Sequence, residues 1–187
     1  MGQEKNITTK VSSVKQISGL KTFEVDDDLK NYQRSIEMAA DNHYQDMVIS
    51  KGSNYAVSFM AKIIEKAEHH IRIFSLDKNF DYLTYEVIIK SIEEAQKRNV
   101  EVQILTNVEN ISEYIRQVYD GLLKDIPPKV FKKHLDSSPV FKSFITGDNC
   151  MYRIEYQVET LDGLGSFNDV RITENFNAIF DELYRQC

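Results

Sequence analysis

Basic residues gather in one stretch of the chain, where they could hold a phosphate or the backbone of a nucleic acid. Lys129, Lys132, Lys133 and His134 lie close together, and Lys142 follows. Clustered lysines neutralise phosphates and bind nucleic acid without reading its sequence. Lysines also protect the exposed edge strand of a sheet, which produces the same pattern. We favour a solvated edge strand and keep phosphate or nucleic-acid binding as the alternative.

A second group of polar residues lies around a turn. The types in Gly147-Asp148-Asn149 favour a turn, and Arg153 and Glu155 follow on an expected strand. Asp148, Arg153 and Glu155 could form a residual polar binding site. A turn aspartate and a surface ion pair explain the same residues more simply.

Two groups that could ligate a metal have simpler structural roles. Asp26, Asp27 and Asp28 precede a helical pattern, where acids cap free amides and favour the helix dipole. His69 and His70 are expected to close the next helix, where a histidine also interacts favourably with the dipole. No third ligand with metal spacing lies near them. We therefore predict no metal and no cofactor.

Size and composition predict one cytoplasmic domain. The chain has 187 residues, 42% of them apolar, and a net charge of −6, which disfavours general binding to nucleic acid or anionic membranes. Its two cysteines do not form a disulfide framework, and we find neither a membrane span nor a signal peptide. Residues 1–22 are polar and are expected to be a flexible segment, followed by an α/β domain over 23–187.

The hydrophobic pattern predicts alternating strands and helices up to the two prolines at 127–128. Such alternation implies a parallel sheet with helices on both faces. Short strands and a hairpin are expected after the prolines, then a loop over 161–169 and a last helix capped by Thr173. The expected helices cover about 27–46, 53–70, 84–97, 111–124 and 173–184; the expected strands cover 47–49, 71–76, 100–105, 129–135, 141–147 and 151–159.

Four segments give the chain a resemblance to the phospholipase-D-like superfamily. The helix from Ser53 runs into a strand of the form I-x-I-x-S, and AQKRNVEVQIL resembles the next strand of that family. FITGDNCMYRIE resembles its later hairpin, and the Gly-Ser-Phe-Asn at 165–168 resembles its Gly-Ser-x-Asn. The resemblance covers about residues 53–187. It implies half of a phospholipase-D-like unit, a three-layer sandwich whose mixed sheet is mostly parallel.

Active members of this superfamily carry His-x-Lys-x-x-x-x-Asp, in which the histidine attacks phosphorus and the lysine binds the phosphate oxygens. Matching Asp148 to the aspartate puts Phe141 at the histidine position and Ser143 at the lysine position. An alignment through His134 leaves the motif incomplete as well. The spacing from Asp148 to Gly165 is also longer than in the family.

The resemblance therefore implies a catalytically inactive domain that serves as an interaction or ligand-sensing module, an accessory subunit. The alternatives are a phosphodiesterase or nuclease with non-standard residues, or a nucleic-acid-binding accessory protein. Active relatives pair two halves, so we expect a homodimer whose seam lies near Phe141, Ser143 and Asp148, a protein partner, and no membrane association. The candidate binding residues are Lys129, Lys132, Lys133, Ser143, Asp148, Arg153, Ser166 and Asn168.

Overall fold

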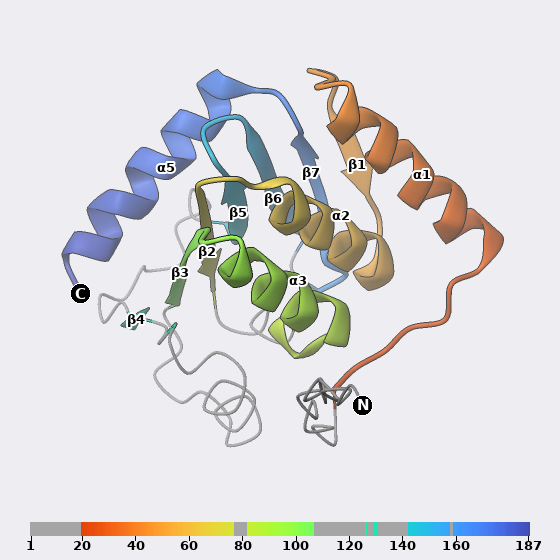
Figure 1. Ribbon diagram of the computed structural model, residues 1–187, viewed down its shortest axis with the longest axis horizontal. Helices are drawn as coiled ribbons and strands as arrows, with labels where there is room; N and C mark the ends of the chain where they lie inside the picture. Colours follow the sequence, from red (N-terminus) through yellow and green to blue (C-terminus); the bar gives the residue numbers. More distant parts are fainter. Residues whose placement is uncertain (1–19, 77–81, 107–125, 127–128, 131–141, 158) are drawn as a thin grey trace, which may run out of the picture.

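The computed structural model describes residues 20–76, 82–106, 126, 129–130, 142–157 and 159–187. Within them, seven strands form one mixed sheet in the order β1-β7-β6-β5-β2-β3-β4 (Figure 1). The strands are β1 (Val48–Ser50), β2 (His70–Ser75), β3 (Glu101–Thr106), β4 (Lys129–Val130), β5 (Phe144–Gly147), β6 (Met151–Gln157) and β7 (Asp162–Ser166). The helices are α1 (Asp27–Asp41), α2 (Ser53–Lys66), α3 (Glu86–Lys97) and α5 (Val170–Arg185).

The predicted mostly parallel sheet is wrong. Only β2–β3 and β3–β4 pair in parallel, whereas β1–β7, β7–β6, β6–β5 and β5–β2 are antiparallel. The cause lies in the second half of the chain, where short connections link β5, β6 and β7. Such connections join only antiparallel neighbours, since a parallel pair needs a long crossover.

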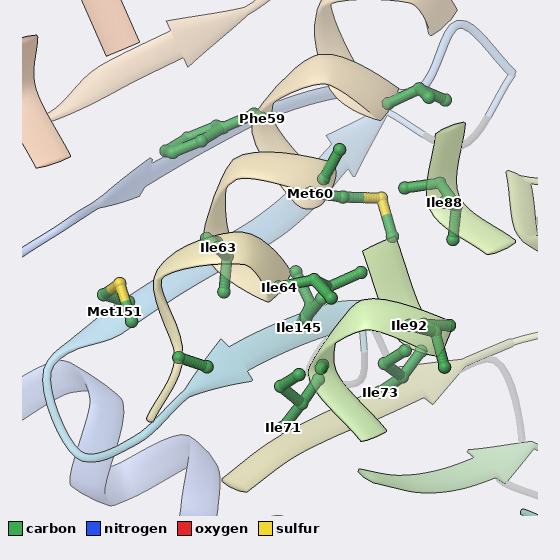
Figure 2. Close-up of a cluster of buried hydrophobic side chains, with 14 of the residues drawn as sticks. Phe59, Met60, Ile63, Ile64, Ile71, Ile73, Ile88, Ile92, Ile145 and Met151 are labelled. Atoms are coloured by element: carbon green, nitrogen blue, oxygen red, sulfur yellow. The ribbon is translucent and has the colours of Figure 1, made fainter. Parts of the chain in front are cut away.

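The three-layer arrangement is confirmed. Helices α1, α2 and α3 lie on one face of the sheet and α5 lies on the other (Figure 1). The larger core joins α2 and α3 to the sheet, with Ile63, Ile64, Ile73 and Ile92 at most 1% exposed (Figure 2). A smaller core beneath α5 contains Phe74, Leu105, Phe144, Phe180 and Leu183. Phe180 and Leu183 of the last helix are therefore core residues.

Capping side chains set several helix boundaries. The Asp26 carboxylate accepts a hydrogen bond from Leu29 N at 2.7 Å, so α1 begins as predicted, although it ends at Asp41. Asp169, and not Thr173, caps α5 by accepting from Ile172 N at 3.0 Å. Helix α2 ends at Lys66, so the two histidines do not close it, and His70 instead opens β2.

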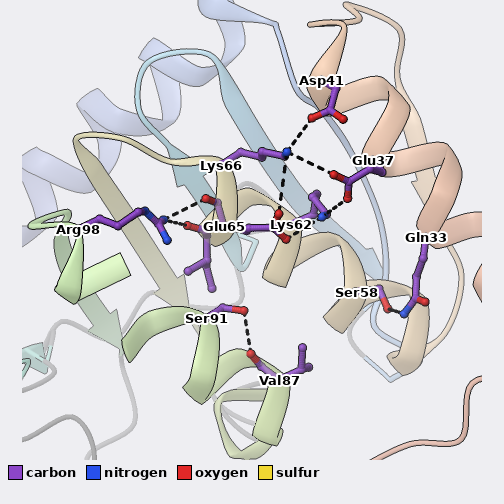
Figure 3. A network of polar contacts seen from close by, with 11 residues as sticks. Gln33, Glu37, Asp41, Ser58, Lys62, Glu65, Lys66, Val87, Ser91 and Arg98 are labelled. Atoms are coloured by element: carbon purple, nitrogen blue, oxygen red, sulfur yellow. Dashed lines mark hydrogen bonds and ion pairs between the residues drawn. The ribbon is translucent and has the colours of Figure 1, made fainter. Parts of the chain in front are cut away.

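Ion pairs and one arginine fasten α2 to its neighbours (Figure 3). Lys62 pairs with Glu37 of α1, and Lys66 lies 2.6 Å from Asp41, which raises the pKa of Lys66. These pairs are partly exposed, so solvent screening leaves each of them a small contribution to stability. Arg98 caps the end of α2, since its Nη2 donates to the carbonyls of Ile64, Glu65 and Ala67 at 3.0 to 3.2 Å.

The chain ahead of α1 also contacts the domain. Lys21 N donates to Thr84 O, and Glu86 N donates to Lys21 O, both at 3.0 Å. Leu20 and Phe23 pack against the larger core. The prediction for residues 1–19 lies outside the described part of the chain. No described helix has the length and apolar character needed to cross a membrane.

Candidate functional site

Arg153, on β6, is the centre of a buried polar group on the α2 side of the sheet. Its side chain is 1% exposed, and that of Glu155 is 2% exposed. Arg153 Nε donates to Ser50 Oγ at 3.1 Å, Nη1 to Glu155 Oε1 at 3.4 Å, and Nη2 to the carbonyl of Leu161 at 2.5 Å. The predicted surface ion pair is therefore wrong, because this pair is buried. We call Ser50, Arg153 and Glu155 the Arg153 cluster.

Two buried tyrosines feel the charge of the Arg153 cluster, and one glycine leaves space for its guanidinium. Burial raises the pKa of Tyr32 and of Tyr82 well above the ordinary value for a phenol, and the charge of Arg153 partly offsets both shifts. Both phenols therefore stay neutral at physiological pH. A Cβ on Gly163 would lie 2.6 Å from Arg153 Nη2, so glycine is needed there to leave room for the guanidinium.

Ser143 lies where the end of β2 meets the start of β5. It is 2% exposed, and its Oγ accepts a hydrogen bond from Leu76 N at 3.1 Å. The structure thus brings the end of the I-x-I-x-S strand beside the position matched to the family's lysine. The Ser143 hydroxyl therefore fixes the backbone amide of Leu76, which follows Ser75. Unlike a lysine, it adds no positive charge to this end of the sheet.

Asp148 lies at the opposite end of β5, where it fastens the β5–β6 turn to the connection between α2 and β2. Its carboxylate accepts from the amides of Glu68, His69 and His70 at 2.8 to 3.0 Å. His70 Nε2 lies 2.8 Å from the Asp148 carbonyl, and burial lowers the pKa of His70. The prediction of a turn aspartate is confirmed, and the hydrogen bonds give it a structural role.

We expect Asp148→Ala to lower the free energy of unfolding by about 2–4 kcal/mol, since hydrogen bonds to a charged group contribute about 1.5–3 kcal/mol. Asp148 also has a φ of 52°, which asparagine tolerates better than alanine. Asp148→Asn keeps one acceptor oxygen and should cost clearly less. Urea denaturation of both variants measures the difference, and equal losses would contradict this account of the turn.

The Gly165-Ser166-Phe167-Asn168 segment anchors the loop between α1 and β1. Ser166 Oγ donates to the carbonyls of Tyr44 and Gln45 at 3.5 and 3.3 Å, and Asn168 Nδ2 donates to the His43 carbonyl at 2.9 Å. A Cβ on Gly165 would overlap the carbonyl oxygen of Tyr152. Gly165 and Ser166, the first two residues of this motif, belong to β7. The prediction of a loop over 161–169 is wrong for that reason.

The predicted binding residues do not converge on one site. Ser166 pairs with Tyr152, which pairs with Thr146, whereas Ser143 precedes β5 and its carbonyl accepts from Glu155 N. The antiparallel register thus puts Ser166 and Asn168 toward the Asp148 end of the sheet, away from Ser143. The expected seam near Ser143 and Asp148 has the same difficulty, because these residues lie at opposite ends of β5.

Of the predicted basic residues, Lys129 and Lys142 lie in the described part of the chain, and Lys129 is engaged within the fold. Lys129 Nζ lies 3.9 Å from the centre of the Tyr184 ring and donates to the Tyr184 carbonyl at 3.4 Å. Phe141, Lys132, Lys133 and His134 lie outside the described residues. No group of three or more histidine, cysteine or acidic side chains placed to hold a metal occurs in the part of the chain that the structure describes.

Solved structures with this arrangement include members of the phospholipase D family. Nuc from Salmonella typhimurium, a phospholipase D family member, is 17% identical with a TM-score of 0.56, over 75% of this chain and 96% of Nuc. NucT from Helicobacter pylori is 12% identical with a TM-score of 0.54, over 76% of this chain and 98% of NucT.

A third similar structure is TrmBL2, an archaeal chromatin protein. It is 12% identical with a TM-score of 0.56, and the alignment covers 84% of this chain and 60% of TrmBL2. No protein-family model and no curated protein matches the sequence. At these identities the likeness concerns the fold alone, and the chain has a phospholipase-D-like fold.

Proposed function

We propose that the chain is a catalytically inactive phospholipase-D-like domain that serves as an interaction or ligand-sensing module, an accessory subunit. The observation that carries the proposal is the state of Arg153, the one buried cationic side chain among the described residues. Its donors are taken by Ser50, Glu155 and the Leu161 carbonyl. Phosphoryl transfer needs positive charge directed at the phosphate, and Glu155 neutralises this charge.

The positions of the other polar groups support the same proposal. His43 lies in the loop after α1 beside Asn168, and His69 and His70 lie beside Asp148, so all three described histidines are away from Ser143. Ser143 itself is buried and is engaged with Leu76 N. None of these groups is a histidine nucleophile beside a phosphate-binding lysine.

We predict no phosphodiesterase turnover by the full chain. Bis(p-nitrophenyl) phosphate and single- and double-stranded DNA serve as substrates, each with Mg²⁺, Mn²⁺, Zn²⁺ or EDTA. The expected rate equals that of buffer. Turnover that co-purifies with the chain and disappears in Ser143→Ala or His134→Ala would establish the alternative, a phosphodiesterase or nuclease with non-standard residues.

Nucleic-acid binding is the second candidate function, and the likeness to TrmBL2 favours it, since that structure is described as showing a novel mode of DNA binding. Lys142 lines a groove together with Phe144 and Ile154, from which its ammonium group can contribute to a local basic surface. Retention on immobilised DNA that falls steeply with salt, and weakens in Lys142→Gln but not in Lys97→Gln, would support this function. Lys97 is a suitable control because it pairs with Glu94 on the far side of the sheet, on α3.

A further inference from the structure

Helix α5 crosses the sheet obliquely and leaves part of this face uncovered. In its first half, the Phe176 ring contacts Tyr152 of β6, with ring centres 5.5 Å apart. At its end, Tyr184 lies against Lys129 of β4, at the far edge of the sheet. The helix therefore diverges from β6 along its length. Ile154, the next residue of β6 that faces α5, is consequently only half-buried.

A groove of about 420 Å³ lies where α5 diverges from β6, and we call it the α5 groove. Phe144 and Ile154, paired on β5 and β6, line it from the sheet. Phe176 and Leu183 line it from α5, and both pack on this sheet. Ile179, which is 40% exposed, is the α5 residue at its open side. The groove therefore has apolar walls that are already fixed by the packing of α5.

The size of the α5 groove favours a small ligand over a protein partner. Sites for small molecules usually measure about 300–1,000 Å³ and combine an apolar lining with a few polar groups. A stable protein partner usually covers about 800 Å² of surface, which calls for a broader contact than this groove offers.

The α5 groove is a different site from the Arg153 cluster. Phe144 and Ile154 face α5. Ser143 and Arg153 directly precede them, and neighbouring residues of a strand point to opposite faces of the sheet. The position matched to the family's lysine therefore lies on the other side of the sheet from the groove.

Two charged side chains lie among the otherwise apolar described residues of the groove, Lys142 and Glu182. The Glu182 carboxylate is engaged within α5, because Oε2 lies 2.9 Å from Arg185 Nη2 and Oε1 accepts from Gln186 Nε2 at 3.0 Å. Lys142 supplies a single positive charge beside the apolar floor. This charge complements a ligand with one negative charge, whereas Glu182 would repel a dianion such as a phosphate monoester.

We propose that the α5 groove binds a single-chain amphiphile with one carboxylate, which is the chemistry of a fatty acid. The apolar tail lies on Phe144 and Ile154, and the carboxylate meets the Lys142 ammonium. The apolar floor continues through Leu164 to Ile49 of the edge strand, which is 50% exposed, so a longer tail finds further apolar surface. The inference rests on the proposed function and deepens it, since it names the ligand class of the sensing module.

Isothermal titration calorimetry of the full chain tests the groove with octanoate, decanoate, decanol and decyl phosphate. We expect saturable binding of one decanoate per chain. Decanoate should bind about tenfold more tightly than octanoate, because two more methylenes become buried. Decanol, which lacks the charge, and decyl phosphate, which carries more than one, should both bind more weakly than decanoate.

Variants at the two ends of the ligand separate the tail from the carboxylate. Lys142→Gln should weaken decanoate about threefold, as loss of an exposed ion pair does, and should leave decanol unchanged. Ile179→Glu puts a charge into the apolar lining and should weaken both ligands at least about tenfold. The matched controls are Lys97→Gln and Met38→Glu; these exposed residues of α3 and α1 lie on the other face of the sheet and should change neither affinity. Circular dichroism checks that every variant is folded.

Three results would overturn the proposal: no saturable binding of decanoate, decanol or decyl phosphate that binds as tightly as decanoate, or an affinity that is the same in Ile179→Glu. A chain that binds decanoate and turns over phosphodiesters refutes the proposed inactivity alone. An inactive chain that does not bind decanoate refutes the assignment of the α5 groove alone.

Discussion

Arg153→Ala should lower the free energy of unfolding by about 3–5 kcal/mol, which is the usual cost of removing one partner of a buried ion pair. The variant leaves Glu155, which is 2% exposed, without the guanidinium. It also removes the donors to Ser50 Oγ and the Leu161 carbonyl. Urea denaturation at neutral pH gives the value directly.

The matched control is Arg185→Ala, which removes an arginine from an exposed pair with Glu182. We expect a change of at most about 0.5 kcal/mol for this variant. A double variant, Arg153→Met with Glu155→Leu, should recover much of the loss, because it leaves no buried charge unpaired. Equal losses for the exposed and the buried arginine would contradict the arrangement of the Arg153 cluster.

Phe180→Ala should cost about 3–5 kcal/mol, the usual range for a buried aromatic residue truncated to alanine. Phe180 is fully buried in the smaller core with Phe74, Leu105 and Leu183. The smaller core contains few other buried side chains. The loss of the Phe180 ring should therefore also weaken the packing of α5 on the sheet. Hydrogen exchange of the α5 amides would detect the loosening.

A control variant in a helix on the opposite face of the sheet separates the loss of core packing from the effect of alanine on helix propensity. Met38→Ala changes a 58%-exposed residue of α1 and should alter the free energy of unfolding by about 0.5 kcal/mol or less. A small loss in Phe180→Ala would mean that α5 adds little to the stability of the domain, which would contradict the packing in the structure.

The amphipathic helices could be predicted from the sequence because their apolar spacing is strong. Strand β7 could not be predicted, since Gly163 and Gly165 have low strand propensity. These glycines are required by close neighbours, Arg153 and the Tyr152 carbonyl, which only the folded chain shows. The one signal for close packing at β7 in the sequence was the alternation of Gly163 and Gly165 with Leu164.

The candidate site was harder to predict than the fold. Arg153 and Glu155 share one side of β6, and two charges on alternate residues of a strand resemble a solvent-facing pair. Helices cover both faces of this sheet, so charged residues on β6 can be buried. Gly165-Ser166-Phe167-Asn168 matches the family in residue types, yet the antiparallel register of β6 and β7 puts it toward the Asp148 end of the sheet, away from Ser143.

The pairing of β1 with β7 has a consequence for the order of folding. Val48 pairs with Gly165, so more than half of the chain must be synthesised before β1 can join the sheet. Closing so large a loop is entropically costly, and contacts at such a separation slow the folding of a domain. On the ribosome, β1 therefore emerges well before β7, the strand with which it pairs, and until β7 follows the apolar residues of β1 are accessible to chaperones.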